Sequence, residues 1–423
     1  MPVDEILIHP APGVTWVAFL ADGHVVELWA EPSDRPSGVG GIALARVTGK
    51  RPGLDALTVR LPDGEAFVKD APKVDDGAAL IVQITRDAIG PKRAVARAAV
   101  ELVEGPVVLT PSRPGIGLSA RITGKARRAA IKTAVQQQVP DDLGCLVRGD
   151  AGGGNPSDIA RTAGVLVERW QDLLRKAETE KAPAWLAAPP GLEDRALRHA
   201  PGAALRSEAD AHLLSAALDT VLDRTLALPG LGVLTIDATE AAVLIDVDLH
   251  ETVGGRGLMA ANSRILEAVA GQIRLRGLRG TILIDLPRMQ KPSDRKVVEA
   301  AFLAAVASDP SPVALLGWTP GGMLEITREG ARRPLHEILW AATEPTQSVR
   351  FAAWQALAAL DTAARRAGEV PARPVLEVSE DVAGWLLGPG AGLVDGLRGR
   401  LGALTVRGSP TCPRSDYRIL SEI

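Results

Sequence analysis

The apolar residues in the first forty positions form short β-type runs separated by turn residues. The runs cover residues 6–8, 16–20 and 25–29, and a Pro/Gly/Ser-rich connection follows over residues 32–41. The last two runs are separated by Ala21-Asp22-Gly23-His24, whose Asp-Gly pair is typical of a tight hairpin turn. The pattern therefore predicts two or three strands at the start of the chain.

Residues 42 to about 99 contain further short β-type runs with turns between them, for example 57–61, 66–68 and 79–84. Strands this short and this closely spaced predict a small barrel. The pattern fits an oligonucleotide-binding module and equally fits any other small barrel.

The rest of the chain mixes helix-type and strand-type segments. Residues 100–178 combine a strand at 106–109 with helices, one of them at 159–175 with Val165, Leu166, Trp170 and Leu173 facing inward. The further helices predicted are 208–226, 260–276, 295–307 and 348–366, and the strands are 232–236, 242–247, 281–286, 313–317 and two near Val375 and Leu404. The alternation predicts an α/β layer with buried strands.

The composition excludes some classes of protein but does not indicate an activity. Apolar residues make up 46% and charged residues 23%, as in a globular protein, and the net charge of −3 means that binding a polyanion requires local basic patches. The two cysteines, Cys145 and Cys412, exclude a disulfide framework and a Cys-rich zinc knuckle. Neither a leader-like segment nor an apolar run of about 20 residues occurs, so we expect a cytoplasmic protein.

Three carboxylates carry the strongest chemical signal. Asp246 and Asp248 end one strand-type run, and Asp285 ends another. Asp285 comes 39 residues after Asp246, which leaves room for a helix between them. If the strands are neighbours, the three acids cluster at strand ends, where α/β sheets gather functional groups. Clustered carboxylates favour a Mg²⁺ ion, which activates water near a phosphodiester. The alternative is that these acids simply cap strand ends in water.

A basic cluster lies between the acids, on the helix at 260–276 and at its exit: Arg274, Arg276 and Arg279. Cations beside an acidic metal site suit an anionic substrate. The alternative is a solvated helix face whose arginines pair with the acids.

The order of these segments resembles the ribonuclease E/G family over nearly the whole chain. The main matches are VLIDVDLHETVGG to RGTILIDLPRM over residues 243–289 and TPGGMLEITR over 319–328. Two earlier matches are ITRDAIGPKRAVA with VVLTPSRPGIGLSARI, and EILIHPAPGVTWVAFLADGHVVELWAE at the start.

The resemblance implies a mixed α+β, multidomain fold. The expected parts are an RNase H-like core (residues 1–38 and 179–235), an inserted S1 (OB) barrel (39–99), a sensor-like region (100–178), a DNase I-like catalytic subdomain (236–342) and a small C-terminal α/β domain (343–423).

It also implies site residues. Asp246 and Asp285 match the magnesium-binding aspartates, and Asp248 stands where the family has Asn. The RNA-binding positions implied are Phe67, Lys92, Arg93, Arg121, Arg148, Asn262, Arg274, Arg276 and Arg328. Among these, Phe67 matches a stacking position of the barrel and Arg148 the arginine of a pocket that senses an RNA 5′-monophosphate.

Several positions depart from the family pattern. Gly149 replaces the threonine of the sensing pocket, Thr58 replaces a second barrel aromatic, and Arg288 after Pro287 replaces an acid. The Cys-Pro-x-Cys zinc link expected after about Leu339 is missing, and Cys412-Pro413-Arg414-Ser415 does not replace it. We therefore expect no structural zinc and no zinc-linked dimer.

The sequence thus predicts a Mg²⁺-dependent endoribonuclease, with Mn²⁺ as an alternative ion, in RNA processing or decay. Its substrate is single-stranded RNA, and its products carry a 5′-phosphate and a 3′-hydroxyl. The alternative within the family is an RNA-binding protein with weak or no nuclease activity, and a third reading is an unrelated scaffold or metabolic enzyme.

Overall fold

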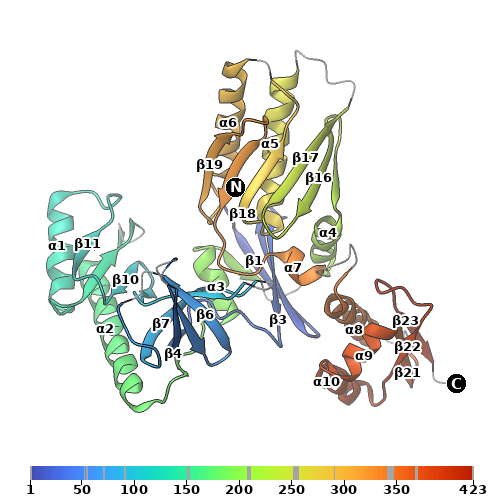
Figure 1. The fold of residues 1–423 in the computed structure, drawn as a ribbon, viewed down its shortest axis with the longest axis horizontal. Coiled ribbons are helices and arrows are strands. Elements are labelled where there is room, and N and C mark those ends of the chain that lie inside the picture. Colours follow the sequence, from blue (N-terminus) through green and yellow to red (C-terminus); the bar gives the residue numbers. More distant parts are fainter. Residues whose placement is uncertain are drawn as a thin grey trace. The chain divides into compact units, whose positions relative to one another are not determined.

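The computed structural model describes residues 2–51, 53, 56–69, 72–89, 92–149, 153–206, 211–250, 257–289, 291–340, 347–366 and 370–421. The fold is mixed α+β (Figure 1) and divides into two compact units. One unit comprises Met1–Pro36 and Gly191–Ile423, and the other, Ser37–Pro190, is inserted into it. None of the helices in the described ranges is both long enough and apolar enough to cross a bilayer.

The inserted unit begins with a closed barrel, as the spacing of short strands predicts. Its five strands are β4 (Ile42–Arg51), β5 (Ala56–Leu61), β6 (Gly64–Lys69), β7 (Ala79–Arg86) and β8 (Ala94–Arg97). β4, β5 and β6 form an antiparallel meander, β8 lies parallel to β6, and β7 pairs with both β8 and β4 to close the barrel. Small apolar side chains such as Val59, Val68 and Val82 fill its interior. The barrel is consistent with an S1/OB-like module.

The second half of this unit is a small α/β layer. Its sheet has the order β11 (Gly115–Leu118), β12 (Gly144–Val147), β10 (Val107–Thr110), β9 (Leu102–Glu104), and its helices are α1 (Lys125–Gln136) and α2 (Pro156–Thr179). A further strand, β13 (Ala184–Ala187), pairs with β4. The Asn155 side chain caps α2 by accepting from the Ser157 amide at 3.1 Å. Leu166 and Leu173 face the core, but Val165 is 52% exposed, so its predicted inward position is wrong.

The other unit opens with a four-stranded sheet, in the order β14 (Ala204–Arg206), β1 (Glu5–Ala11), β2 (Val14–Ala21), β3 (His24–Pro32). Asp22 and Gly23 both have positive φ, 50° and 74°, as the predicted hairpin turn requires. Helix α3 (Leu192–His199) packs on one face. Helices α4 (Ala211–Leu222), α7 (Leu335–Leu339) and α8 (Val349–Arg365) contribute to the core on the other face.

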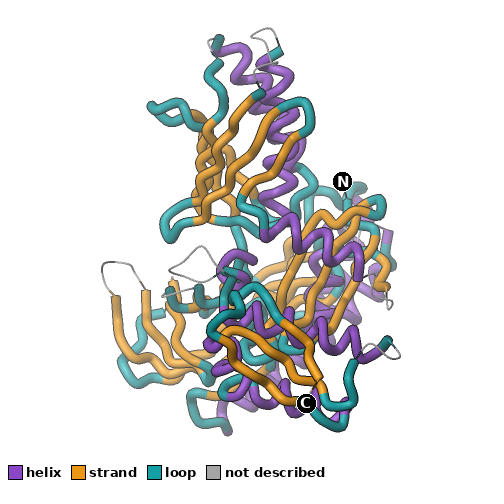
Figure 2. Tube along the Cα trace, turned by 90° about the vertical axis from the view of Figure 1, so that its right-hand side faces the viewer, coloured by secondary structure: helices purple, strands orange, loops and turns teal. Residues whose placement is uncertain are grey.

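A six-stranded sheet follows, with helices along one of its faces (Figure 2). Its order is β15 (Thr225–Leu228), β16 (Gly232–Ala238), β17 (Val243–Leu249), β18 (Gly280–Asp285), β20 (Leu324–Arg328), β19 (Val313–Trp318), and α5 (Leu258–Leu275) and α6 (Pro292–Val306) share its core. Strand β15 begins at Thr225, inside the range predicted as helix 208–226. Alternate residues of β17 are exposed, so the predicted burial holds for only one face of this strand.

The chain ends in a small three-stranded sheet, β22 (Thr405–Ser409), β21 (Pro374–Ser379), β23 (Arg418–Ser421), packed with α8, α9 (Glu380–Leu387) and α10 (Ala391–Leu401). The Ser348 hydroxyl caps α8 by accepting from the Phe351 amide at 3.1 Å. The helix predicted at 348–366 is therefore confirmed nearly to the residue.

Candidate functional site

The two predicted metal-binding aspartates lie side by side in the six-stranded sheet. β17 and β18 are neighbouring parallel strands, and their register pairs Asp246 directly with Asp285. Adjacent strands are about 4.8 Å apart, so the two carboxylates can reach one ion. Ile245 and Ile284, at 1% and 0% exposure, face the helices, so the aspartates project from the opposite face. The condition for bringing the two acids together, that their strands are neighbours, is therefore met.

The position of each aspartate within its strand differs. Asp285 ends β18, as the sequence predicts. Asp246 does not end a strand, because β17 continues to Leu249 in an antiparallel ladder with β16. The acidic pair therefore lies at the end of β18 and in the middle of β17, on the face of the sheet that the helices do not cover.

Asp246 and Asp285 line a pocket of about 500 Å³. The rest of its wall consists of Val247, Leu286, Pro287, Arg288, Arg295, Thr319, Pro320, Gly321 and Gly322. Neither aspartate side chain forms an ion pair or a hydrogen bond with a residue that the structure describes. Two adjacent carboxylates that pair with no described residue, in one pocket, fit a hard divalent cation, which takes oxygen ligands and retains water.

The third predicted carboxylate does not join this pair. Asp248 projects from the same face of β17, but it lies two residues further along, about 6.6 Å from Asp246, beside Val233 of β16. It does not line the pocket. Over the described ranges, no group of three His, Cys, Asp or Glu is placed to hold a metal ion. The predicted three-acid cluster is thus reduced to a pair, and a catalytic role for Asp248 stays a prediction.

Asn262 is fully buried on α5, at 0% exposure. Its side-chain amide donates to the Pro287 carbonyl at 3.1 Å. This contact fixes the loop that follows Asp285 and forms part of the pocket wall. Asn262 thus lies beneath the pocket instead of facing it, and its predicted contact with RNA stays a prediction.

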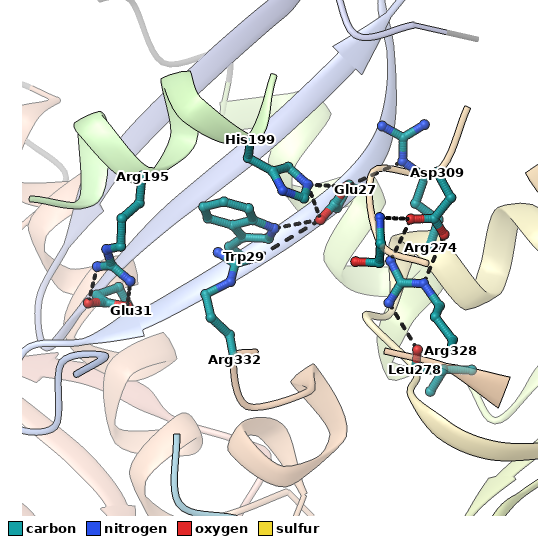
Figure 3. A network of polar contacts seen from close by, with 11 residues as sticks. Glu27, Trp29, Glu31, Arg195, His199, Arg274, Leu278, Asp309, Arg328 and Arg332 are labelled. Atoms are coloured by element: carbon teal, nitrogen blue, oxygen red, sulfur yellow. Dashed lines mark hydrogen bonds and ion pairs between the residues drawn. The ribbon is translucent and has the colours of Figure 1, made fainter. Parts of the chain in front are cut away.

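Arg274 is held inside the fold by a buried acid, Glu27 of β3 (Figure 3). Its Nε lies 3.3 Å from Glu27 Oε2, and the two side chains are 9% and 5% exposed. Burial raises the pKa of Glu27, but hydrogen bonds from His199 and Trp29, with the charges of His199 and Arg332, lower that pKa to about 2. Arg274 therefore ties the helix behind the acidic pair to the first sheet.

Arg276 and Arg328 are also internal. Arg276 donates to the carbonyls of Thr220, Val221 and Asp223 at 2.7–3.2 Å, at the end of α4, and burial lowers its pKa to about 10. Arg328 makes two bonds to Asp309, at 2.8 and 3.0 Å, and one to the Leu278 carbonyl at 3.0 Å (Figure 3).

The burial of Arg274 and Arg276 corrects the expectation of a basic cluster that faces an anionic substrate, and Arg328, a separately predicted RNA-binding residue, is buried as well. Their guanidinium groups serve as internal donors, and contact with RNA by any of the three stays a prediction. The cations that do line the pocket, Arg288 and Arg295, were not among the predicted site residues. Arg288 was visible only as a departure from the family pattern, and no motif marked Arg295.

The predicted RNA-binding residues of the barrel lie on its outside. Phe67 of β6 points outward between the buried Ala66 and Val68, and the Arg93 guanidinium carbon is 5.4 Å from its ring centre. Lys92 is exposed in the same segment as Arg93. An aromatic ring beside exposed cations can stack a base and hold its phosphate.

Arg121 and Arg148 lie close together in the inserted unit, and both are exposed. Gly149, which follows Arg148, packs against Arg121: a Cβ added at Gly149 would lie only 2.8 Å from Arg121 Cβ. The absence of a side chain at 149 therefore lets Arg121 lie directly against the backbone beside Arg148.

The segment that lacks the zinc link runs from α7 to α8. Trp340 and Gln347 form an isolated β-bridge, and the residues between them lie outside the described ranges. Cys145 and Cys412 are buried free thiols, and burial raises the pKa of both, that of Cys145 to about 11. Thiols with raised pKa values are poor metal ligands. The expectation of no structural zinc stays a prediction.

Comparison with known proteins places these features in a family context. The model of the "Ribonuclease E/G family" matches residues 103–207 and 205–331. The chain is 25% identical to Ribonuclease G of Salmonella typhimurium (strain SL1344) in an alignment of 398 residues, and the match covers 79% of this chain and 81% of that protein. Ribonuclease G of Escherichia coli (strain K12) is 26% identical with the same coverage. Ribonuclease E of Nostoc sp. (strain PCC 7120 / SAG 25.82 / UTEX 2576) is 24% identical over 71% of this chain and 52% of its own.

Proposed function

Because this chain belongs to the ribonuclease E/G family, we propose that it is an endoribonuclease, a hydrolase that cleaves single-stranded RNA with Mg²⁺ as its cofactor. The observation that carries the proposal is the register pairing of Asp246 with Asp285 on the open face of the sheet, inside a pocket. Because no described protein group neutralises these carboxylates, their charge is available to a cation.

The residues have separate tasks in this mechanism. Asp246 and Asp285 would hold the ion, and their two negative charges would balance its charge. When bound, Mg²⁺ supplies Lewis acidity toward the phosphodiester and lowers the pKa of water. The buried loop contact of Asn262 keeps Asp285 and its strand end in place.

The hydrolysis is balanced as follows. The oxygen of a water molecule bonds to phosphorus and the bond from phosphorus to the 3′ oxygen breaks. One proton of the water goes to the 3′ oxygen, and the other stays with the new 5′-phosphate or is released to solvent. The products carry a 5′-phosphate and a 3′-hydroxyl. Mn²⁺, which also takes oxygen ligands, is expected to substitute for Mg²⁺.

We also propose the finer assignment of the parts. The four-stranded sheet with parallel β14 is RNase H-like, the barrel is an S1 module, and the six-stranded sheet with α5 and α6 is DNase I-like. In the barrel, Phe67 stacks a base, and Lys92 and Arg93 contact the backbone. Arg121 and Arg148 bind RNA phosphate in the sensor-like region.

A second candidate function is an RNA-binding protein that cleaves weakly or not at all. The position of Asp248 outside the pocket and the replacement of the sensing threonine by Gly149 favour it. In that case the same surfaces bind RNA without hydrolysis.

The test is cleavage of a 5′-labelled single-stranded RNA with and without Mg²⁺, comparing the wild type with Asp246→Asn/Asp285→Asn. Asp237→Asn is the matched control, because Asp237 lies on the same sheet but pairs with Arg224 at 2.6 Å. The nuclease proposal expects metal-dependent cutting that only the double variant loses. Binding of RNA by all three proteins, with cutting by none, would favour the second function.

A further inference from the structure

Two arginines line the pocket without an anionic partner among the described residues. Arg288 lies in the loop after β18, and Arg295 lies in the first turns of α6. Both line the pocket with Asp246 and Asp285, yet neither forms an ion pair or side-chain hydrogen bond with a described residue. The pocket thus combines two unpaired anions with two unpaired cations.

Arg295 is held in place without losing its hydrogen-bond donors. Its guanidinium carbon lies 4.7 Å from the ring centre of Trp318, which ends β19. Trp318 is in turn fixed by a bond of 2.5 Å from its Nε1 to Glu299, one turn further along α6. Stacking engages the face of a guanidinium and leaves the N–H groups at its edge free for an anion.

Arg288 stands on a fixed loop, although its own side chain is exposed. The flanking Leu286 and Met289 are 4% and 5% exposed, and Asn262 binds the Pro287 carbonyl from below. The backbone at Arg288 is therefore anchored on both sides, while the side chain is free to reach a ligand in the pocket.

We propose that Arg288 and Arg295 are the phosphate-binding residues of this site, an inference that rests on the proposed nuclease function. Arg295, which is preorganised, contacts the non-bridging oxygens of the scissile phosphate, where negative charge grows in the transition state. Arg288, which is exposed, contacts a neighbouring phosphate of the same strand. Trp318 is a positioning residue for Arg295.

The two roles predict different kinetic effects. Arg295→Ala lowers the single-turnover cleavage rate by about 10²–10³-fold with little change in RNA affinity, because one preorganised donor is lost from the transition state. Arg288→Ala weakens RNA binding and leaves the rate at saturation nearly unchanged. It also reduces the slope of log affinity against log salt by about 0.7, the value for one phosphate contact with a single strand.

The experiment measures single-turnover rate, RNA affinity and its salt dependence for both variants, with Lys296→Ala as the matched control. Lys296 is an exposed cation next to Arg295 on the same helix that does not line the pocket. Trp318→Leu and the double variant Trp318→Leu/Arg295→Ala complete a double-mutant cycle. The double variant should cleave no more slowly than Arg295→Ala alone, because Trp318 acts through Arg295. Arg295→Lys keeps the charge if Arg295→Ala fails to fold.

The outcomes distinguish a failure of the phosphate-binding inference from a failure of the nuclease function. The inference is overturned if Arg288→Ala and Arg295→Ala cut and bind like Lys296→Ala, or if Trp318→Leu and Arg295→Ala combine additively. If the wild type does not cut, the nuclease function fails, but the salt dependence of RNA binding still tests both arginines. An unchanged slope in Arg288→Ala/Arg295→Ala then overturns the inference as well.

Discussion

Glu27→Gln should destabilise the first sheet strongly, although the substitution hardly changes the shape of the side chain. The Glu27 carboxylate accepts from Trp29 Nε1 at 2.7 Å and lies 2.9 Å from His199 Nε2 (Figure 3). Arg274 and Arg332 add positive charge at 3.3 and 3.9 Å. Glutamine removes the negative charge and turns an N–H₂ group toward these donors.

The size of the effect follows from two independent arguments. A carboxyl whose pKa falls from 4.5 to about 2 on folding contributes about 3 kcal/mol at neutral pH. Removing one partner of a buried charge pair typically costs about 3–5 kcal/mol, because the remaining charges lose compensation. Since folding lowers this pKa, the contribution is complete above pH 4.5 and is lost as the pH falls toward 2.

Hydrogen exchange in a urea series measures the opening free energy of β1 to β3 without assuming that the whole chain unfolds in one step. Glu5→Gln is the matched control on the same sheet, because Glu5 pairs with Arg206 in an exposed position and should lose less than about 1 kcal/mol. Equal, small losses in Glu27→Gln and Glu5→Gln would refute the reasoning. So would a difference between wild type and Glu27→Gln that does not shrink below pH 4.5.

Three further changes test other parts of the fold. Arg328→Met leaves the buried Asp309 unpaired and should cost about 3–5 kcal/mol in urea unfolding; an effect below 1 kcal/mol would contradict the buried pair. Burial, with the nearby charge of Arg279, lowers the pKa of His336 from 6.5 to about 4. Because the unfolded chain then binds the proton more tightly, the free energy of unfolding should fall by about 3 kcal/mol between pH 6.5 and 4. A His336→Gln variant with the same pH profile would disprove this. Gly149→Thr forces Arg121 to move and should cost about 1–3 kcal/mol, measured by thermal melting, with Arg121→Ala relieving part of the loss.

The pattern of apolar residues predicts the sheet around the acidic pair because that sheet follows simple rules. Two β-type runs separated by one helix imply a parallel crossover, and such strands are commonly neighbours. The alternation in β17 also indicates which residues share a face. The pairing of Asp246 with Asp285 depends on the register of β17 and β18, however, and no local sequence motif specifies that register.

The partners of the arginines in this part of the chain could not be predicted from the sequence. Arg274 meets Glu27 across 247 positions of sequence, and Arg328 meets Asp309 in a loop with no distinctive pattern. Arginines close to acids in the sequence are compatible with a charged surface as well as with buried ion pairs. The burial of Arg274 and Arg328 is therefore apparent only from the three-dimensional structure. Arg295 is the converse case, because its stacking partner Trp318 lies on a different strand and identifies the position only after folding.

The helix predicted at 208–226 illustrates a local ambiguity. Residues Thr225–Leu228 are apolar enough to extend a helix, but they form β15 because β16 offers an antiparallel partner. Short apolar segments of this kind are resolved by tertiary pairing rather than by propensity.

The claim that Asp285 is a metal ligand can be tested most directly by exchanging its oxygen for sulfur. Asp285→Cys should fail to cleave single-stranded RNA with Mg²⁺ and regain cleavage with Mn²⁺, which accepts a softer ligand more readily. Asp237→Cys should cleave with both ions, like the wild type. Cleavage by Asp285→Cys in Mg²⁺ at the wild-type rate would contradict the metal site and the account built on it.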